Sequence, residues 1–247
     1  MQIRVVHEDA DLLVLDKPSG LLSVPGKGPD KQDCLSARVQ ALYPDALVVH
    51  RLDMATSGLM VMARGPAMQR ILSDAFASRN VTKRYCAVVA GELQASNDPI
   101  EADTDLHFGN PWQVIDLPIA LNWANRPLRH IDTKNGKPST TRWQVCADFG
   151  QPFEIGNGVD SGISMGTEIQ FEKSTPFTRL LLEPVTGRSH QLRVHLAAIG
   201  HPILGDALYA PAHVLALAPR LLLHSSQLTL AHPLTGVNMS FHAVTPF

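Results

Sequence analysis

Three polar segments, far apart in the sequence, contain the side chains best suited to chemistry. Asp53 lies between two apolar runs, just before the Thr-Ser-Gly turn at 56–58. On its own, such an aspartate most simply caps backbone N–H groups in an Asx turn. Its candidate neighbours favour a chemical role. Arg188, at a strand-to-helix junction, can pair with it, and Lys83 and Tyr85 alternate on a predicted strand, so they face the same side.

Spacing excludes several other active sites. HRLD at 50–53 and DFG at 148–150 match two kinase motifs, but they are too far apart and no glycine-rich phosphate loop precedes them. His190 and His195 fall on different faces of a predicted helix and have no spaced carboxylate, which disfavours a metal site. The segment 186–190 is not a serine-hydrolase nucleophile elbow. We expect neither a metal nor a nucleoside triphosphate.

The distribution of charge indicates an anionic ligand. The 247-residue chain has a net charge of −2, which argues against a protein held to nucleic acid by bulk charge alone. Its basic residues are nevertheless clustered: residues 79–85 contain three basic residues and no acid, and residues 126–142 contain five basic residues and one acid. An acidic body with a few basic faces suits a selective anion-binding cleft.

Hydrophobic periodicity predicts more strands than helices. We expect 92–138 to form loops with little regular structure, and the glycine-rich stretch 150–166 to form a long exposed hairpin or loop. Asp33 and Ser189 are the expected N-caps of two helices. Strands are predicted at 3–6, 12–15, 21–24, 48–50, 59–63, 81–89, 140–147, 178–183, 221–223, 228–230 and 237–241, and helices at 34–43, at 66–78 and between Ser189 and Gly200.

These elements predict an α+β protein with a mixed, mostly antiparallel central sheet, flanked by a few helices and loops around a cleft. The chain is long enough to bury a sizeable core without disulfides, and Cys34, Cys86 and Cys146 do not suggest a disulfide framework. The N-terminus lacks the features of a secretory signal, and no uncharged apolar stretch approaches the roughly 20 residues of a membrane span. We expect a cytoplasmic protein.

Four segments, in order, resemble the successive motifs of the RluA-type RNA pseudouridine synthases. They are HRLDMATSGL at 50–59, KRYCA at 83–87, TGRSHQLRVH at 186–195 and GHPILGD at 200–206, and the lead-in DKPSGL at 16–21 also fits. The resemblance covers nearly the whole chain and implies the pseudouridine synthase fold in a single catalytic domain over 1–247. Many relatives carry an N-terminal S4 RNA-binding domain, for which the 49 residues before the HRLD motif leave no room.

The resemblance also implies a reaction and its substrates. Such an enzyme isomerises uridine in RNA to its C5-glycoside, which requires no cofactor, metal or redox change. The segments at 22–26, 116–119 and 123–127 are most similar to those of dual-specificity members of the family. This implies that 23S rRNA, the tRNA anticodon stem-loop, or both are substrates. We expect a monomer whose partner is RNA.

In this interpretation Asp53 carries the reaction. It acts as a nucleophile at C1′, as a nucleophile on the base, or as a base that removes a ribose proton, and the sequence leaves the three routes open. Arg188 is expected to offset the cost of burying this carboxylate and to fix its direction. Tyr85 is expected to stack on the extruded base, and its hydroxyl offers a second role in proton transfer. Phosphate contacts are expected from Arg51, Lys83, Arg84, Arg126 and Arg193.

Two other functions fit the same cleft. A non-catalytic RNA-binding protein would use the same basic surface without turnover. A glycosidase would need a second carboxylate beside Asp53, and no motif supplies one.

Overall fold

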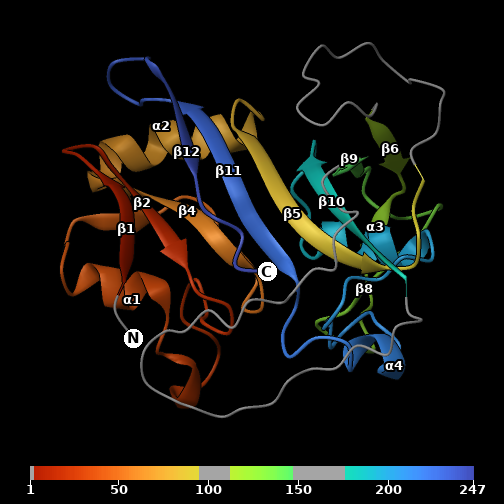
Figure 1. Ribbon diagram of the computed structural model, residues 1–247. Helices are drawn as coiled ribbons and strands as arrows, with labels where there is room; N and C mark the ends of the chain where they lie inside the picture. The colour runs from red at the N-terminus through yellow and green to blue at the C-terminus, as the bar shows by residue number, and fades with distance from the viewer. Residues whose placement is uncertain (1–2, 95–111, 147–175) are drawn as a thin grey trace.

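The computed structural model describes residues 3–94, 112–146 and 176–247, in which strands predominate over helices (Figure 1). The helices are α1 (Leu35–Gln40), α2 (Gly65–Ala77), α3 (Gln191–Ala198) and α4 (Ala212–Leu215), and η1 (Pro29–Lys31) is a short 3₁₀ turn. The strands are β1 (Arg4–Glu8), β2 (Leu12–Lys17), β3 (Ala46–Val48), β4 (Ser57–Arg64), β5 (Thr82–Ala90), β6 (Gln113–Asp116), β7 (Ile119–Leu121), β8 (Arg129–Ile131), β9 (Thr140–Val145), β10 (Phe177–Pro184), β11 (Leu223–Ala231) and β12 (Asn238–His242).

The strand β11, from the C-terminal part of the chain, lies in the middle of the main sheet. The strand order is β1-β2-β4-β11-β5-β10-β9-β6, with β3 added beside β4 and β12 beside β11. Figure 1 shows β11 between a first half made of β1, β2 and β4 and a second half made of β5, β10, β9 and β6. Among the described strands, only β4 and β11 pair in parallel. The predicted α+β class with a mixed, mostly antiparallel sheet is confirmed.

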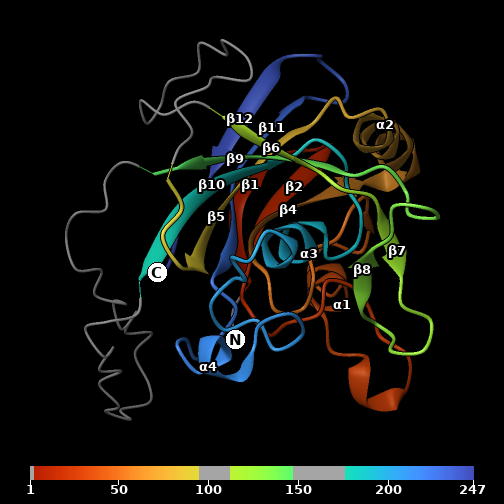
Figure 2. The ribbon, with the colours of Figure 1, turned by 90° about the vertical axis from the view of Figure 1, so that its right-hand side faces the viewer.

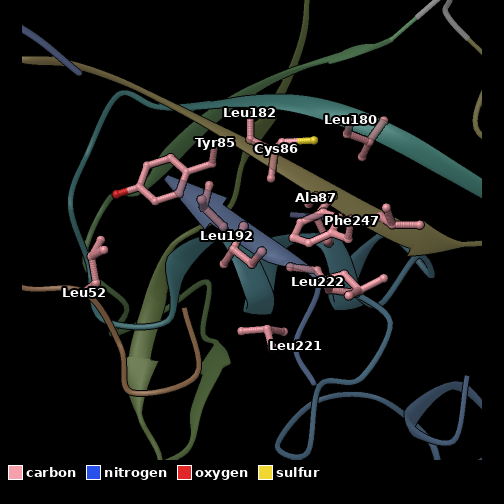
Figure 3. Packing of buried hydrophobic residues seen from close by; sticks show 14 of the residues in the cluster. Leu52, Tyr85, Cys86, Ala87, Leu180, Leu182, Leu192, Leu221, Leu222 and Phe247 are labelled. Atoms are coloured by element: carbon pink, nitrogen blue, oxygen red, sulfur yellow. The ribbon is translucent and has the colours of Figure 1, made fainter. Parts of the chain in front are cut away.

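Both faces of the inner strands β2 and β4 are buried, whereas the edge strand β1 is mostly exposed. On β2, Leu13 and Leu15 belong to one core cluster, to which α1 and α3 contribute, whereas Leu12 and Val14 belong to a second cluster beside Leu72 of α2. Strands covered on both faces have continuous apolar sequences, as residues 59–63 of β4 do. Figure 3 shows part of the first cluster, in which side chains from β5, β10 and α3 meet.

The segment that leads into α1 departs from the prediction. Residues 21–24, predicted as a strand, form only an isolated bridge. The N-cap of α1 is Cys34, whose Sγ accepts the N–H of Ala37 at 3.4 Å. Asp33, the predicted cap, instead forms an ion pair with Arg38, 2.6 Å away. The predicted cap is wrong because the guanidinium engages this carboxylate along the helix.

The region 92–138, predicted as loops, contains short strands in its described part. The strand β6 joins the edge of the main sheet, and β7 and β8 form a separate hairpin, which lies beside α3 (Figure 2). Strands this short contain too few residues to show a period. The strand predicted at 228–230 is part of the longer strand β11, which begins at Leu223, the last residue of the strand predicted at 221–223. The register of β11 against β5 shifts between Ser225 and Gln227. The segments 148–150 and 150–166 lie outside the described residues.

The other described elements lie close to their predicted positions, including α2 and strands β1, β2, β4, β5, β9, β10 and β12. Within the described ranges, every helix is too short or too polar to span a bilayer.

The strands β4 and β11 come closest at Gly58, where a side chain would not fit. Its φ of +107° favours glycine. A Cβ there would lie 2.6 Å from the backbone nitrogen of Ser225 and would overlap the carbonyl of that residue. We predict that Gly58→Ala lowers the free energy of unfolding by about 3 kcal/mol or more, measured by urea denaturation.

Gly236→Ala is the matched control for this prediction. Gly236 also has a positive φ, +72°, but open space surrounds the position of its missing Cβ. The substitution should therefore cost only the backbone term, about 1 kcal/mol. Equal losses at Gly58 and Gly236 would contradict the close approach of β4 to β11.

Candidate active site

The three polar segments meet at one cavity of about 450 Å³. It is bordered by the loop before β4, by β5, and by the turn and helix that follow β10. Asp53, Lys83, Tyr85 and Arg188, the residues grouped from the sequence, all line it. The structure thus brings these four residues together at one cavity.

The register of the sheet explains why these segments meet. Ser225 of β11 lies opposite Gly58 of β4 on one side and opposite Tyr85 of β5 on the other. The start of β4 and the first half of β5 are therefore level with each other across β11. The loop that carries Asp53 immediately precedes β4, so it enters the cavity on the side where Tyr85 projects.

Side chains from the 17–23 segment hold the Asp53 loop in place. Ser23 Oγ donates to the carbonyl of Leu52 at 2.7 Å and accepts the N–H of the same residue at 3.1 Å. Ser19 Oγ donates to the carbonyl of Ala55 at 2.7 Å. Asp53 thus has a fixed backbone on both sides, although its own side chain remains 28% exposed toward the cavity.

A buried lysine completes this support. The ammonium of Lys17 is shielded from solvent and donates to the carbonyls of Pro18, Leu21 and Met54 at 2.9, 2.8 and 3.1 Å. All three of its protons are used, and one bond reaches the residue after Asp53. Burial lowers the pKa of Lys17 to about 8, and the Asp53 carboxylate acts in the opposite direction.

The cation that contacts Asp53 is Arg193. Its Nη1 lies 3.3 Å from Asp53 Oδ2, while its Nε and Nη2 bind the two oxygens of Asp206 at 2.8 and 2.6 Å. Asp206 is completely buried. Burial disfavours the charge of Arg193, but Asp206 and Asp53 outweigh that effect and raise the pKa of the guanidinium. The arginine is therefore a permanent charge in a fixed direction.

The predicted ion pair between Arg188 and Asp53 is wrong. Arg188 lines the same cavity, but it is exposed, and its Nη2 donates to the carbonyl of Pro138 at 3.5 Å, with no ion pair to Asp53. The sequence did contain a signal that Arg193 is the ion-pair partner. Arg193 stands between Leu192 and Val194 within an apolar stretch of a helix, where a charged residue needs a partner.

The turn before α3 is fixed by Gln191. Its side-chain oxygen accepts the hydroxyl of Thr186 at 2.7 Å and the N–H of Arg188 at 3.0 Å. Its amide nitrogen donates to the carbonyl of Thr140 at 2.9 Å. The predicted cap, Ser189, is not used, because the N-cap position falls at the next residue, His190, in the left-handed region with a φ of +58°. Gln191 satisfies the turn instead.

His190, which the sequence analysis did not assign to the site, faces Asp53. Its Nε2 lies 3.9 Å from Asp53 Oδ1, and its Nδ1 lies 2.6 Å from the hydroxyl of Tyr209. That hydroxyl also accepts the N–H of Arg129 at 3.0 Å. Burial lowers the pKa of His190, which favours the neutral imidazole, while Asp53 acts in the opposite direction. In the structure, His190 is distinguished by its left-handed backbone, which is unusual for a residue other than glycine.

Tyr85 and Lys83 project from β5 toward the same cavity, as predicted. Tyr85 is 9% exposed, and Figure 3 shows its hydroxyl on the side where Leu52 lies. Burial raises the pKa of this hydroxyl to about 12, so it is a neutral phenol at pH 7. The Lys83 ammonium has no ion-pair partner among the described residues. Its pKa is lowered mainly by burial and to a smaller extent by repulsion from Arg79.

The remaining predicted phosphate contacts divide into two groups. Arg51 lies exposed at the cavity, and Arg126 is exposed on the loop between β7 and β8. Arg84 projects to the other side of β5, is only 8% exposed, and pairs with Glu183 at 3.5 Å. Its burial and this ion pair make Arg84 unsuitable as a phosphate contact, and Arg193 is committed to two carboxylates.

One cluster in the described residues has the geometry of a metal site, but none of its members lines the cavity. It consists of Asp9, Asp11 and His232. The Nδ1 of His232 accepts the N–H groups of Leu234 and Thr235, at 3.2 and 3.1 Å. Its proton therefore belongs on Nε2, which points at Asp9, 3.3 Å away. Hydrogen bonding explains the cluster without an ion.

Comparison with known proteins identifies the family. A family model described as RNA pseudouridylate synthase matches residues 11–198. The dual-specificity RNA pseudouridine synthase RluA of Escherichia coli strain K12 is 39% identical over 243 residues, which cover 98% of this chain and 93% of the relative. The chain belongs to the RNA pseudouridylate synthase family. The RluA protein of Yersinia pestis is 40% identical, with 98% of this chain and 99% of the relative covered.

A solved structure is also similar to this synthase. Human RNA pseudouridylate synthase domain containing 1 matches with a TM-score of 0.70 and 25% identity, covering 100% of this chain and 84% of the other. The predicted resemblance and fold are confirmed. The protein is an isomerase that converts uridine in RNA to pseudouridine, and the non-catalytic alternative is not favoured.

The first prediction for the site concerns Arg193. Arg193→Lys keeps the charge but cannot bind both oxygens of Asp206 and also reach Asp53. We expect its turnover number to fall at least about 100-fold, because a small misplacement at a reacting group has effects of that size. The measurement is the release of tritium from RNA labelled at uridine C5. Arg188→Lys, which also keeps its charge, should lose much less, and the reverse order would restore Arg188 as the partner of Asp53.

A second prediction concerns pH. The pKa of Lys17 falls from 10.5 to about 8 on folding, so between these values the unfolded chain binds more protons and stability due to Lys17 rises with pH. We predict that the unfolding free energy of the wild type, minus that of Lys17→Met, rises by up to about 3 kcal/mol from pH 8 to 10.5. Urea denaturation across this range measures it. A difference that does not change with pH would contradict a buried, charged Lys17.

Proposed function

We propose that Asp53 is the residue that attacks or deprotonates the target uridine. The observation that carries this proposal is its position. It is a partly exposed carboxylate in a cavity of about 450 Å³, next to Arg193 at 3.3 Å. A cavity of this size falls within the usual range for small-molecule sites and suits one nucleoside. The three chemical routes for Asp53 remain open: attack at C1′, attack on the base, or removal of a ribose proton.

The reaction needs no other reactant. The bond from C1′ to N1 of the base breaks, a bond from C1′ to C5 forms, the proton on C5 leaves, and N1 gains a proton. Every route uses the ionised Asp53 carboxylate and temporarily removes its charge. Arg193 lies 3.3 Å from this carboxylate, and its second carboxylate partner, Asp206, keeps the guanidinium paired when Asp53 is neutral.

We propose that Tyr85 supports the extruded base. Extrusion of a uridine costs a few kcal/mol, and less in a loop than in a duplex. Stacking on an aromatic ring returns about 1–3 kcal/mol. The Tyr85 ring lines the cavity that contains Asp53, which supports this role. Its phenol is neutral at pH 7 and can donate a hydrogen bond to the base or take part in proton transfer.

The cations around the cavity are suited to the RNA backbone. Arg51, Lys83 and Arg188 all line it, and none has an ion-pair partner among the described residues. We therefore assign phosphate contacts to these three and to Arg126. Arg188 changes role in this assignment, from partner of Asp53 to phosphate contact.

We propose that the substrates are 23S rRNA and the tRNA anticodon stem-loop. The family resemblance implied 23S rRNA, the tRNA anticodon stem-loop, or both, and the name dual-specificity RNA pseudouridine synthase that several relatives carry supports both. The protein would act as a monomer in the cytoplasm, in one catalytic domain. The glycosidase alternative receives no support, because Asp53 is the only carboxylate among the described residues that line the cavity.

Asp53→Asn tests the central role. The amide is of similar size and leaves the pair of Arg193 with Asp206 intact, so we expect the variant to fold and to bind RNA with an affinity close to that of the wild type. Tritium release from RNA labelled at uridine C5 should fall below detection. Near-UV circular dichroism and a filter-binding assay provide the controls. Turnover by a purified, folded Asp53→Asn protein would refute the assignment.

A further inference from the structure

One tryptophan is placed where a core residue would not be. The chain has three tryptophans. Trp112 and Trp143 are 4% and 7% exposed, whereas Trp123, in the loop between β7 and β8, is 71% exposed. A large aromatic side chain left this exposed contributes little to folding, and its ring offers a surface on which a nucleobase can stack.

A cation accompanies the exposed ring. The guanidinium carbon of Arg126 lies 3.8 Å from the centre of the Trp123 ring. Arg126 is itself exposed and forms no ion pair within the described residues, so its charge is available to an anion. The guanidinium thus lies over the Trp123 ring in a cation–π contact. An exposed indole and a guanidinium are the two groups that bind single-stranded nucleic acid, one for the base and one for the phosphate.

The loop that carries this pair is held by its own hydrogen bonds. The N–H of Asn122 donates to the carbonyl of Leu128 at 3.0 Å, and the N–H of Leu128 donates to the carbonyl of Asn125 at 2.9 Å. The side-chain oxygen of Asn122 accepts the N–H of Asn125 at 3.2 Å. A loop ordered before binding loses less conformational entropy when a ligand docks.

The hairpin is connected directly to the active site. The strand β8 contacts α3, and Figure 2 shows the two side by side. The N–H of Arg129, in β8, donates to the hydroxyl of Tyr209, which binds His190, and His190 faces Asp53. An RNA whose uridine occupies the cavity therefore lies beside this hairpin.

The surroundings favour RNA over a protein partner. His130, Lys134 and Lys137 are exposed on β8 and on the turn that follows it. Asp132, in the same turn, accepts the backbone N–H groups of Lys134 and Asn135, which fix that turn. The turn with these lysines lies at the end of the hairpin where Ile119 pairs with Ile131, whereas Trp123 and Arg126 lie at the other end, beyond the pair of Leu121 with Arg129. The hairpin thus carries cations at both ends, which suits an extended phosphate backbone.

We propose that Trp123 and Arg126 form a second nucleobase-binding site, which stacks one unpaired base of the same RNA loop that delivers the target uridine. This inference rests on the proposed function, since it assumes an RNA stem-loop in the cavity. The first site binds the base that is modified, and the second binds a neighbour and sets the register of the loop.

The test uses RNA binding by Asp53→Asn protein, so that no turnover occurs. Trp123→Ala should weaken the binding of an anticodon stem-loop RNA roughly 5- to 150-fold, the range for one lost base–aromatic stack, and Trp123→Phe should lose much less. The matched control is Leu234→Ala. Leu234 is 68% exposed on the turn between β11 and β12, and its replacement should leave the dissociation constant unchanged.

Fluorescence gives an independent measurement. Because the other two tryptophans are buried, quenching of emission by added RNA should be lost in Trp123→Phe and retained in Leu234→Ala. An RNA with abasic sites at the unpaired loop positions other than the target should bind wild type and Trp123→Ala equally. Equal affinities of Trp123→Ala and wild type for intact RNA would overturn the second site. Absence of tritium release by the wild-type enzyme would overturn the proposed function instead.

Discussion

The ion pair between Arg193 and Asp206 is the interaction on which the active site depends. Asp206 is completely buried, and both of its oxygens bind the guanidinium. One oxygen also accepts the N–H groups of Leu208 and Tyr209. The arginine is thus held from behind without any contribution from Asp53, and it presents its remaining nitrogen to that carboxylate. A buried arginine whose only partner were the reacting group would be left unpaired whenever that group lost its charge, at a cost of several kcal/mol.

The need for one fixed cation beside Asp53 explains why the other groups around it are neutral or already hydrogen-bonded. Lys17 lies under the Asp53 loop, but its three protons are used by backbone carbonyls. Burial favours the neutral form of His190 and keeps the Tyr85 phenol protonated. The cations left free, such as Lys83, stand at the cavity where phosphates would approach. The site therefore separates one permanently paired cation, which directs the carboxylate, from unpaired cations that serve the anionic substrate.

The sequence predicted those parts of the molecule that depend on local pattern. Buried strands such as β4 are visible in the sequence as apolar runs. The alternation on β5 predicted that Lys83 and Tyr85 face the same side, and both line the cavity in the structure. The same alternation places Arg84 on the opposite side, where it pairs with Glu183. The two-residue period of the strand therefore already argues against Arg84 as a phosphate contact at the cavity. The predicted helix caps were wrong for a different reason, because other nearby side chains take over their positions. Asp33 pairs with Arg38, and Gln191 rather than Ser189 fixes the turn before α3.

What the sequence could not supply was the choice between two arginines five residues apart. Arg188, in a polar turn at a helix start, had the local features of an ion-pair partner. Arg193 is selected by Asp206, which folds back onto α3 from a following loop, and by the position of β4 across β11. Asp206, the third member of the network, therefore decides which arginine pairs with Asp53. A carboxylate that needs a cation can take either arginine, but a buried arginine already paired from behind is the only one whose position is fixed before the substrate arrives.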